Sequence, residues 1–263
     1  MTTPRTERIP VLVPTLTKQS WLFMIGSALF ALSVAPGMSH FINTQGANLL
    51  CFVGAWFFTA AGLQQWILSG AATLPVKYQP GKMFRAEWLA AGVQSVGTIL
   101  FNVSTTGALS ATTVHDEKHL VWNPDAGGSV AFLISAVFVL IAYDHANKAW
   151  SPSKPGWWSA WINMIGCVAF GFSAVGSFIQ PDGSAADSDM ANWGTFIGAI
   201  CFFMASLIAL PKQPWNRAAT AEAEKKFQES LKEGTPAHVS QHGEGAHGKP
   251  THAPEHGAWK HGT

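Results

Sequence analysis

Residues 157–211 have the sequence WWSAWINMIGCVAFGFSAVGSFIQPDGSAADSDMANWGTFIGAICFFMASLIALP. An apolar run to Ile179 is followed by a short acidic loop and by a second apolar run from Asn192 to Leu210. A helix needs about 20 predominantly apolar residues to cross the hydrocarbon core of a bilayer, and both runs are close to that length. The stretch therefore predicts a helical hairpin that crosses a membrane twice.

A short pattern in this hairpin, Gly-x3-Phe-x2-Ser, occurs twice more along the chain. Its three copies are Gly26, Phe30 and Ser33; Gly97, Phe101 and Ser104; and Gly166, Phe170 and Ser173. The three positions of each copy fall on one face of a helix. We therefore predict three tandem hairpins of parallel topology, each beginning on the same side of the membrane.

The second helices of the hairpins also resemble one another. The predicted helices 47–69 and 192–210 each contain a Gly-Ala pair, which begins at Gly54 and at Gly198. The predicted helix 127–143 has Ser135-Ala136 at the equivalent place. Small residues at matched depth let helices approach closely, so packing explains the pattern. A substrate path along a pseudo-threefold axis is the alternative interpretation.

The composition agrees with a membrane protein. Charged residues make up 12% of the 263 residues and apolar residues 48%, which argues against a soluble globular domain. No Asp, Glu, Lys or Arg occurs in five long runs, 19–76, 88–114, 127–143, 155–181 and 190–211. The net charge of +1 offers nothing to attract nucleic acid.

These runs predict an all-α integral membrane protein with six transmembrane helices. We place the helices at about residues 21–38, 47–69, 87–111, 127–143, 157–179 and 192–210. The predicted parts of the chain are an N-terminal segment (1–20), three hairpins with their connectors (21–70, 71–143 and 144–211) and a C-terminal tail (212–263).

The distribution of basic residues predicts the orientation. Of the sixteen Lys and Arg residues, only Lys118 falls on the side opposite the termini. By the positive-inside rule both termini are then cytoplasmic, in a bacterial cytoplasmic (inner) membrane. Six acids are predicted to lie in the outer loops, Asp116, Glu117, Asp125, Asp182, Asp187 and Asp189.

The last hairpin resembles the uncharacterised bacterial YrhK-like membrane family. The shared features are Asn192, Gly198 and Ala199 at the start of the last helix and the exit Leu207-Ile208-Ala209-Leu210-Pro211. The resemblance covers about a fifth of the chain and implies no activity.

Three uncharged polar residues are the candidates for the interior of the bundle. Asn102 lies about midway along its predicted helix, and Gln94 and Asn163 share one repeat position. A carboxamide that faced lipid would leave its hydrogen-bonding groups unmet, so these side chains are predicted to face other helices. They either form hydrogen bonds between helices or bind a small polar ligand.

Two groups of histidines are candidate metal ligands. His115 and His119, with Asp116 and Glu117 between them, could bind a divalent metal on the outer face, and a solvated loop is the alternative. The tail, predicted to be disordered past Gly234, contains six more. Imidazoles of this kind suit zinc, copper or nickel; they are His238, His242, His247, His252, His256 and His261.

No catalytic constellation, phosphate loop or cofactor motif is recognisable, and Cys51, Cys167 and Cys201 fall in apolar runs. We therefore expect no enzyme and no cofactor. The leading hypothesis is a protein of packing, interaction or assembly within the bilayer, whose partners are lipid and another membrane protein or a second copy. The alternatives are a channel or facilitator for a small neutral or weakly polar solute, and a metal-responsive protein that uses the tail.

Overall fold

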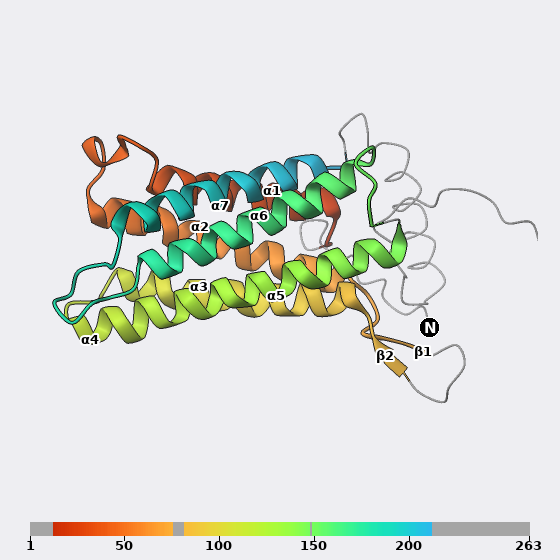
Figure 1. The fold of residues 1–263 in the computed structure, drawn as a ribbon, viewed down its shortest axis with the longest axis horizontal. Helices are drawn as coiled ribbons and strands as arrows, with labels where there is room; N and C mark the ends of the chain where they lie inside the picture. Colours follow the sequence, from red (N-terminus) through yellow and green to blue (C-terminus); the bar gives the residue numbers. More distant parts are fainter. Residues whose placement is uncertain (1–12, 76–81, 148, 212–263) are drawn as a thin grey trace, which may run out of the picture.

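The computed structural model describes residues 13–75, 82–147 and 149–211, which form one bundle of long helices (Figure 1). Within this part of the chain the long helices are α1 (Leu16–Ser33), α2 (Thr44–Leu68), α3 (Ala86–Ala108), α5 (Asn123–Ala146), α6 (Pro155–Gly176) and α7 (Ser188–Ala209). Four stretches are long and apolar enough to cross a membrane: α2, the continuous helix from Val114 to Ala146, α6 and α7. The prediction of a mostly helical protein with apolar helices of membrane-spanning length is confirmed at that level.

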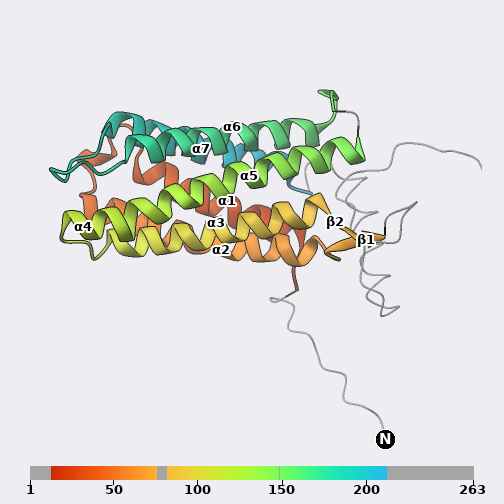
Figure 2. The ribbon, with the colours of Figure 1, turned by 60° about the horizontal axis from the view of Figure 1, so that its bottom comes forward.

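The six long helices close into a ring. Each packs against the next one along the chain, and α7 packs against α1. Figures 1 and 2 show all six lying side by side, with short α4 (Val114–Asp116) at one end and the strands β1 (Thr73–Pro75) and β2 (Lys82–Phe84) at the other. We call these the α4 end, which also holds the 177–187 loop, and the β-hairpin end.

The predicted boundaries of the first helix shift for local reasons. α1 begins at Leu16 because Thr15 caps it, its side chain accepting a hydrogen bond from the Lys18 amide. It ends at Ser33, before Pro36, since proline disfavours the helical conformation of the residue that precedes it. The helix was predicted to continue to residue 38, whereas the chain makes a separate 3₁₀ turn at Met38–His40.

Two connectors predicted as loops are partly ordered. The basic connector before α3 forms an antiparallel pair, in which Thr73 faces Phe84 and Pro75 faces Lys82. The stretch predicted as an outer loop around His115 is helical: α4 is followed by a π-helical segment, Glu117–Trp122, that runs into α5. The predicted start of this helix near residue 127 is therefore too late.

Candidate functional site: an aromatic core and two polar layers

The glycines of the repeat lie where the two helices of a pair approach closely. A Cβ atom on Gly26 would lie 3.0 Å from the carbonyl oxygen of Gly54. The equivalent distances are 3.1 Å from Gly128 for Gly97, and 3.1 Å from Gly166 for Gly198. Each of these positions also faces a phenylalanine ring of the opposite helix. A Cβ atom at any of these positions would require the facing phenylalanine ring or the opposite helix to shift.

Six phenylalanines fill the centre of the ring at this level, one from each long helix. They are at most 5% exposed, and they are Phe30, Phe58, Phe101, Phe132, Phe170 and Phe202. Neighbouring rings have centroids between 5.0 and 6.4 Å apart, mostly edge-on or tilted, which is the favoured range for aromatic pairs. We call this group the phenylalanine core.

Two members of this arrangement were missed in the sequence. Gly128 approaches Gly97, and Phe132 packs on Phe101 with centroids 5.0 Å apart. The predicted equivalent, Ser135-Ala136, lies two turns further along α5, and Ser135 instead contacts Gln94. The spacing Gly-x3-Phe, shared with Gly54-Phe58 and Gly198-Phe202, was the signal that could have identified the pair.

A layer on the β-hairpin side of the phenylalanine core contains small polar residues. Ser27, Thr98 and Cys167, each directly after a repeat glycine, are fully buried. The Thr98 hydroxyl donates to the carbonyl of Ser95, whereas the Ser27 hydroxyl has no hydrogen-bond partner. One buried polar group in this layer is therefore left unsatisfied.

The three predicted interior carboxamides bond to different neighbours. Gln94 accepts a hydrogen bond from Ser135 of α5 at 2.9 Å, and Asn163 lies 3.9 Å from the sulfur of Cys167 on its own helix. Asn102 donates to Thr59 of α2, and its carbonyl oxygen is buried without a partner. No contact among the described residues joins the three to one another.

A second polar layer lies on the α4 side of the phenylalanine core. The Cys51 thiol donates to the Ser33 hydroxyl at 3.0 Å, and the Ser173 hydroxyl lies 2.7 Å from that of Thr195. Cys51 and Thr195 both stand three residues before a repeat glycine, and Asp125 stands at the same place before Gly128. Ser104, at the position of Ser33 and Ser173, is buried in α3.

Asp125 was predicted in an outer loop, and the structure corrects this. The residue lies in α5, within the continuous helix Val114–Ala146, one turn from the approach of Gly128 to Gly97. Its side chain is partly buried. A carboxyl group inside a helical bundle of this type is a functional candidate.

Side-chain hydrogen bonds and a ring contact hold the segments of the α4 end in place. The Trp122 indole N–H donates to the carbonyl of Ala174 at 2.8 Å, and its ring packs edge-on against Phe178. In the neighbouring loop the Ser184 amide and hydroxyl both donate to Asp182, at 2.9 and 2.7 Å. These hydrogen bonds to the charged form lower the pKa of the Asp182 carboxyl.

The candidate metal ligands do not assemble into a site among the described residues. His115 and His119 lie ring to ring, with centroids 4.3 Å apart, and Asn123 bonds to His119. No group of three or more His, Cys, Asp or Glu side chains that could hold a metal ion occurs in the described part of the chain. The six tail histidines, His238 to His261, lie outside it.

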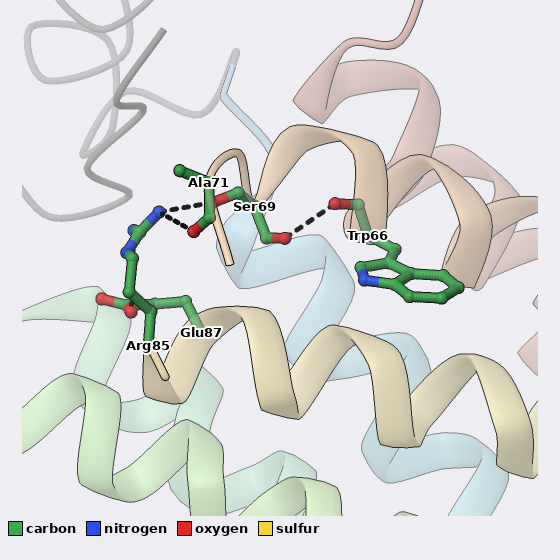
Figure 3. A network of polar contacts seen from close by, with 5 residues as sticks. All are labelled: Trp66, Ser69, Ala71, Arg85 and Glu87. Carbon is green, nitrogen blue, oxygen red and sulfur yellow. Dashed lines mark hydrogen bonds and ion pairs between the residues drawn. The ribbon is translucent and has the colours of Figure 1, made fainter. Parts of the chain in front are cut away.

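The β-hairpin end contains a buried cation, which is shown in Figure 3. Arg85 is 4% exposed and donates to the carbonyls of Ser69 at 2.7 Å and Ala71 at 3.2 Å. Its guanidinium also lies 3.6 Å from the Glu87 carboxylate. These contacts satisfy carbonyl groups just past the end of α2 and tie the β-hairpin to the bundle.

Comparison with protein-family models, with curated proteins and with solved structures finds no match to this chain. The resemblance of residues 157–211 to the YrhK-like family stays a prediction.

Proposed function

We propose that this chain is a non-enzymatic integral membrane protein whose role is interaction or assembly within the bilayer. The observation that carries the proposal is the phenylalanine core, because one ring from each of the six helices fills the centre of the bundle. Apolar side chains also cover the outside, for example Trp56, Val96 and Phe172, which are 54–58% exposed. A bundle that is filled inside and apolar outside offers its surface to lipid or to other proteins.

The proposed topology has six membrane-crossing helices in three hairpins, with both termini cytoplasmic in a bacterial inner membrane. α1 and α3 complete the ring beside the four most apolar helices. With 18 residues, α1 is about 27 Å long at 1.5 Å per residue, close to the thickness of the hydrocarbon core. In each hairpin a glycine of one helix lies close to a glycine of the other and faces a phenylalanine at the equivalent position. This similarity supports the hairpin repeat.

Cysteine labelling in intact cells tests this topology. Cys51, Cys167 and Cys201 are first replaced, and single cysteines are then introduced by Gly183→Cys at the α4 end and Met83→Cys in β2. An impermeant maleimide is expected to label the first variant in whole cells and the second only after lysis. Labelling of both from the same side would contradict the six-helix topology.

The assembly role is tested by the state of the protein in its native membrane. Full-length protein extracted in polymer-bounded lipid discs is expected to give a stoichiometric complex, with itself or with another membrane protein. Photo-crosslinkers at the outward positions Trp56 and Phe172 are expected to capture the same species. A crosslinker at buried Phe132 is the matched control, and a monomer without adducts at outward positions would refute the role.

One observation favours a facilitator for a small, weakly polar solute as a second candidate. The carbonyl oxygen of Asn102 is buried without a partner between α2 and α3, so it could accept a hydrogen bond from a solute. Solute uptake by proteoliposomes is expected to fall when Asn102→Leu removes this acceptor, with Asn163→Leu as the control on another helix. If both variants and the native protein take up solute equally, Asn102 does not line a path for the solute.

The composition of the tail supports a third proposal, a metal-responsive protein. Six histidines between His238 and His261 would supply imidazole ligands. Titration of the full-length protein with zinc or nickel is expected to show binding that is lost on deletion of residues 234–263. Binding only at millimolar metal would rule out a sensing role.

A further inference from the structure

Three aromatic residues form a ladder that runs from α2 and α3 onto β2 at the β-hairpin end. The Trp66 ring meets the Trp88 ring edge-on, with centroids 5.7 Å apart, and the Phe84 ring stacks on Trp88 at 5.9 Å. Phe84 is 58% exposed and Trp66 is 38% exposed. We call these three residues the aromatic ladder. Its rings contact whatever surrounds this end of the protein.

The strand β2 has apolar side chains on both of its faces. Met83 and Phe84 are successive residues of this strand, so their side chains point to opposite faces. Met83 is 55% exposed, so both side chains are more than half exposed. An antiparallel ribbon with one face packed and the other in water commonly has one apolar and one polar face. Apolar material is therefore expected on both sides of this ribbon.

Hydrogen bonds fix the ribbon at the ends of α2 and α3. The Arg85 amide donates to the carbonyl of Ala72 at 2.9 Å, and its guanidinium donates to the carbonyls of Ser69 and Ala71 (Figure 3). Figure 1 shows both strands outside the ring of helices. The exposed apolar side chains therefore belong to an element that is held in a defined place beside the bundle.

The aromatic ladder lies at the depth where the hydrocarbon of a membrane would end. Gly97 and Gly198 stand midway along α3 and α7, so the glycine approaches mark the centre of a membrane that the bundle crosses. The hydrocarbon then ends about 15 Å from this level. Trp88 stands nine positions before Gly97, about 14 Å along α3. Trp66 stands twelve positions after Gly54, about 18 Å along α2. The two indoles straddle the boundary, and β2 lies beyond them.

We propose that the aromatic ladder and β2 form a lipid-binding surface that lies among the headgroups and first acyl carbons of phospholipids in one leaflet. The inference rests on the membrane topology proposed above. Indole rings favour this zone because they combine an apolar body with a polar N–H group. Lipid can surround the ribbon on both sides, whereas a protein partner would cover one face. The exposed Met83 and Phe84 on opposite faces therefore favour lipid.

Spin-label accessibility in phosphatidylcholine vesicles tests the proposal. Full-length protein without its native cysteines carries one nitroxide, at Met83→Cys, and collisions with oxygen, which dissolves in lipid, are compared with collisions with a water-soluble nickel chelate on both sides of the membrane. Val96→Cys, outward on α3 beside Gly97, is the control for lipid, and Ala186→Cys in the 177–187 loop is the control for water. The oxygen-to-nickel ratio at Met83 is expected to be several-fold above that at Ala186 and below that at Val96.

The other outcomes separate this proposal from the proposed topology. A ratio at Met83 equal to that at Ala186 would place the ribbon in water and overturn the lipid-binding surface. Low access of both reagents at Met83 would show a protein neighbour, such as a second copy of the chain, and would also overturn it. If the label at Val96 behaves like that at Ala186, the bundle does not lie in lipid, and the topology fails together with the inference.

Discussion

The two ends of the bundle differ in the partners that they provide for an ionisable residue. At the β-hairpin end, Arg85 has two carbonyl acceptors and the Glu87 carboxylate within 3.6 Å. At the α4 end, Asp125 is partly buried in α5 and forms no ion pair among the described residues. Burying a charge is tolerated where its partners are present, so Arg85 is explained by structure alone. Asp125 is the group whose presence requires another explanation.

The largest effect is expected at the β-hairpin end. Arg85→Ala leaves the carbonyls of Ser69 and Ala71 without their donor and should cost about 3 kcal/mol. Melting in detergent should fall by roughly 5 to 10 °C. Glu87, which is 36% exposed, is the matched control, and Glu87→Gln should cost less than about 1 kcal/mol. Equal losses in both variants would mean that the ion pair, and not the carbonyl contacts, dominates this end.

A steric change at the α4 end should come next. A Cβ atom on Gly176 would lie 2.6 Å from the amide nitrogen of Ala191 and 2.7 Å from the carbonyl oxygen of Asp187. Both are backbone atoms, so Gly176→Ala should cost about 2 kcal/mol, measured by thermal unfolding. Gly127→Ala is the control, because a Cβ atom there meets only the flexible end of Leu100, at 3.3 Å. An unchanged melting temperature for Gly176→Ala would show that α6 and the start of α7 can move apart here at little cost.

Removal of one hydrogen bond should have a smaller effect. Trp122→Phe keeps an aromatic ring but loses the donor to Ala174 and should cost about 1 kcal/mol in thermal unfolding. Trp158→Phe loses a similar bond to Pro152 near the β-hairpin end, but that bond is exposed and should matter less. If the two variants behave alike, the π-helical segment is not held by this contact.

The smallest effect concerns the 177–187 loop. Because Ser184 donates to Asp182, the pKa of Asp182 is lower in the folded protein, and the stabilisation it gives is present at neutral pH and lost as the pH falls through that lowered value. Hydrogen exchange of the Ser184 amide should therefore show an acid-induced loss of protection in the native protein. Asp182→Asn should remove this pH dependence with no measurable change in melting temperature, and a persistent dependence would assign it to another group.

The sequence predicts the helices better than their ends. Long uncharged runs identify six helices because apolar length is a strong signal, and the repeat glycines mark the close approaches. The start of α5 was misplaced because the charged segment around Glu117 resembles a loop, whereas its carbonyls and the Trp122 indole pack against α3 and α6. Such tertiary contacts do not produce a periodic pattern of apolar residues in the sequence.

The candidate site was predicted only in part. Asn102 and Gln94 were recognised as interior residues, and they bond to neighbouring helices. Asp125 was missed because a carboxylate near the end of an apolar run resembles a loop residue. Only the spacing to Gly128, the same as that of Cys51 to Gly54, could have placed it inside the bundle.

Contact between α1 and α7 completes the ring, although these are the first and last helices of the described chain. During synthesis α1 can therefore pack against α2 early, but it contacts α7 only after α7 has been made. A ribosome-bound chain that ends after α6 lacks the helix that contacts both α1 and α6. The same connectivity should let the protein be circularly permuted, with Leu16 and Ala209 joined and new ends opened between hairpins.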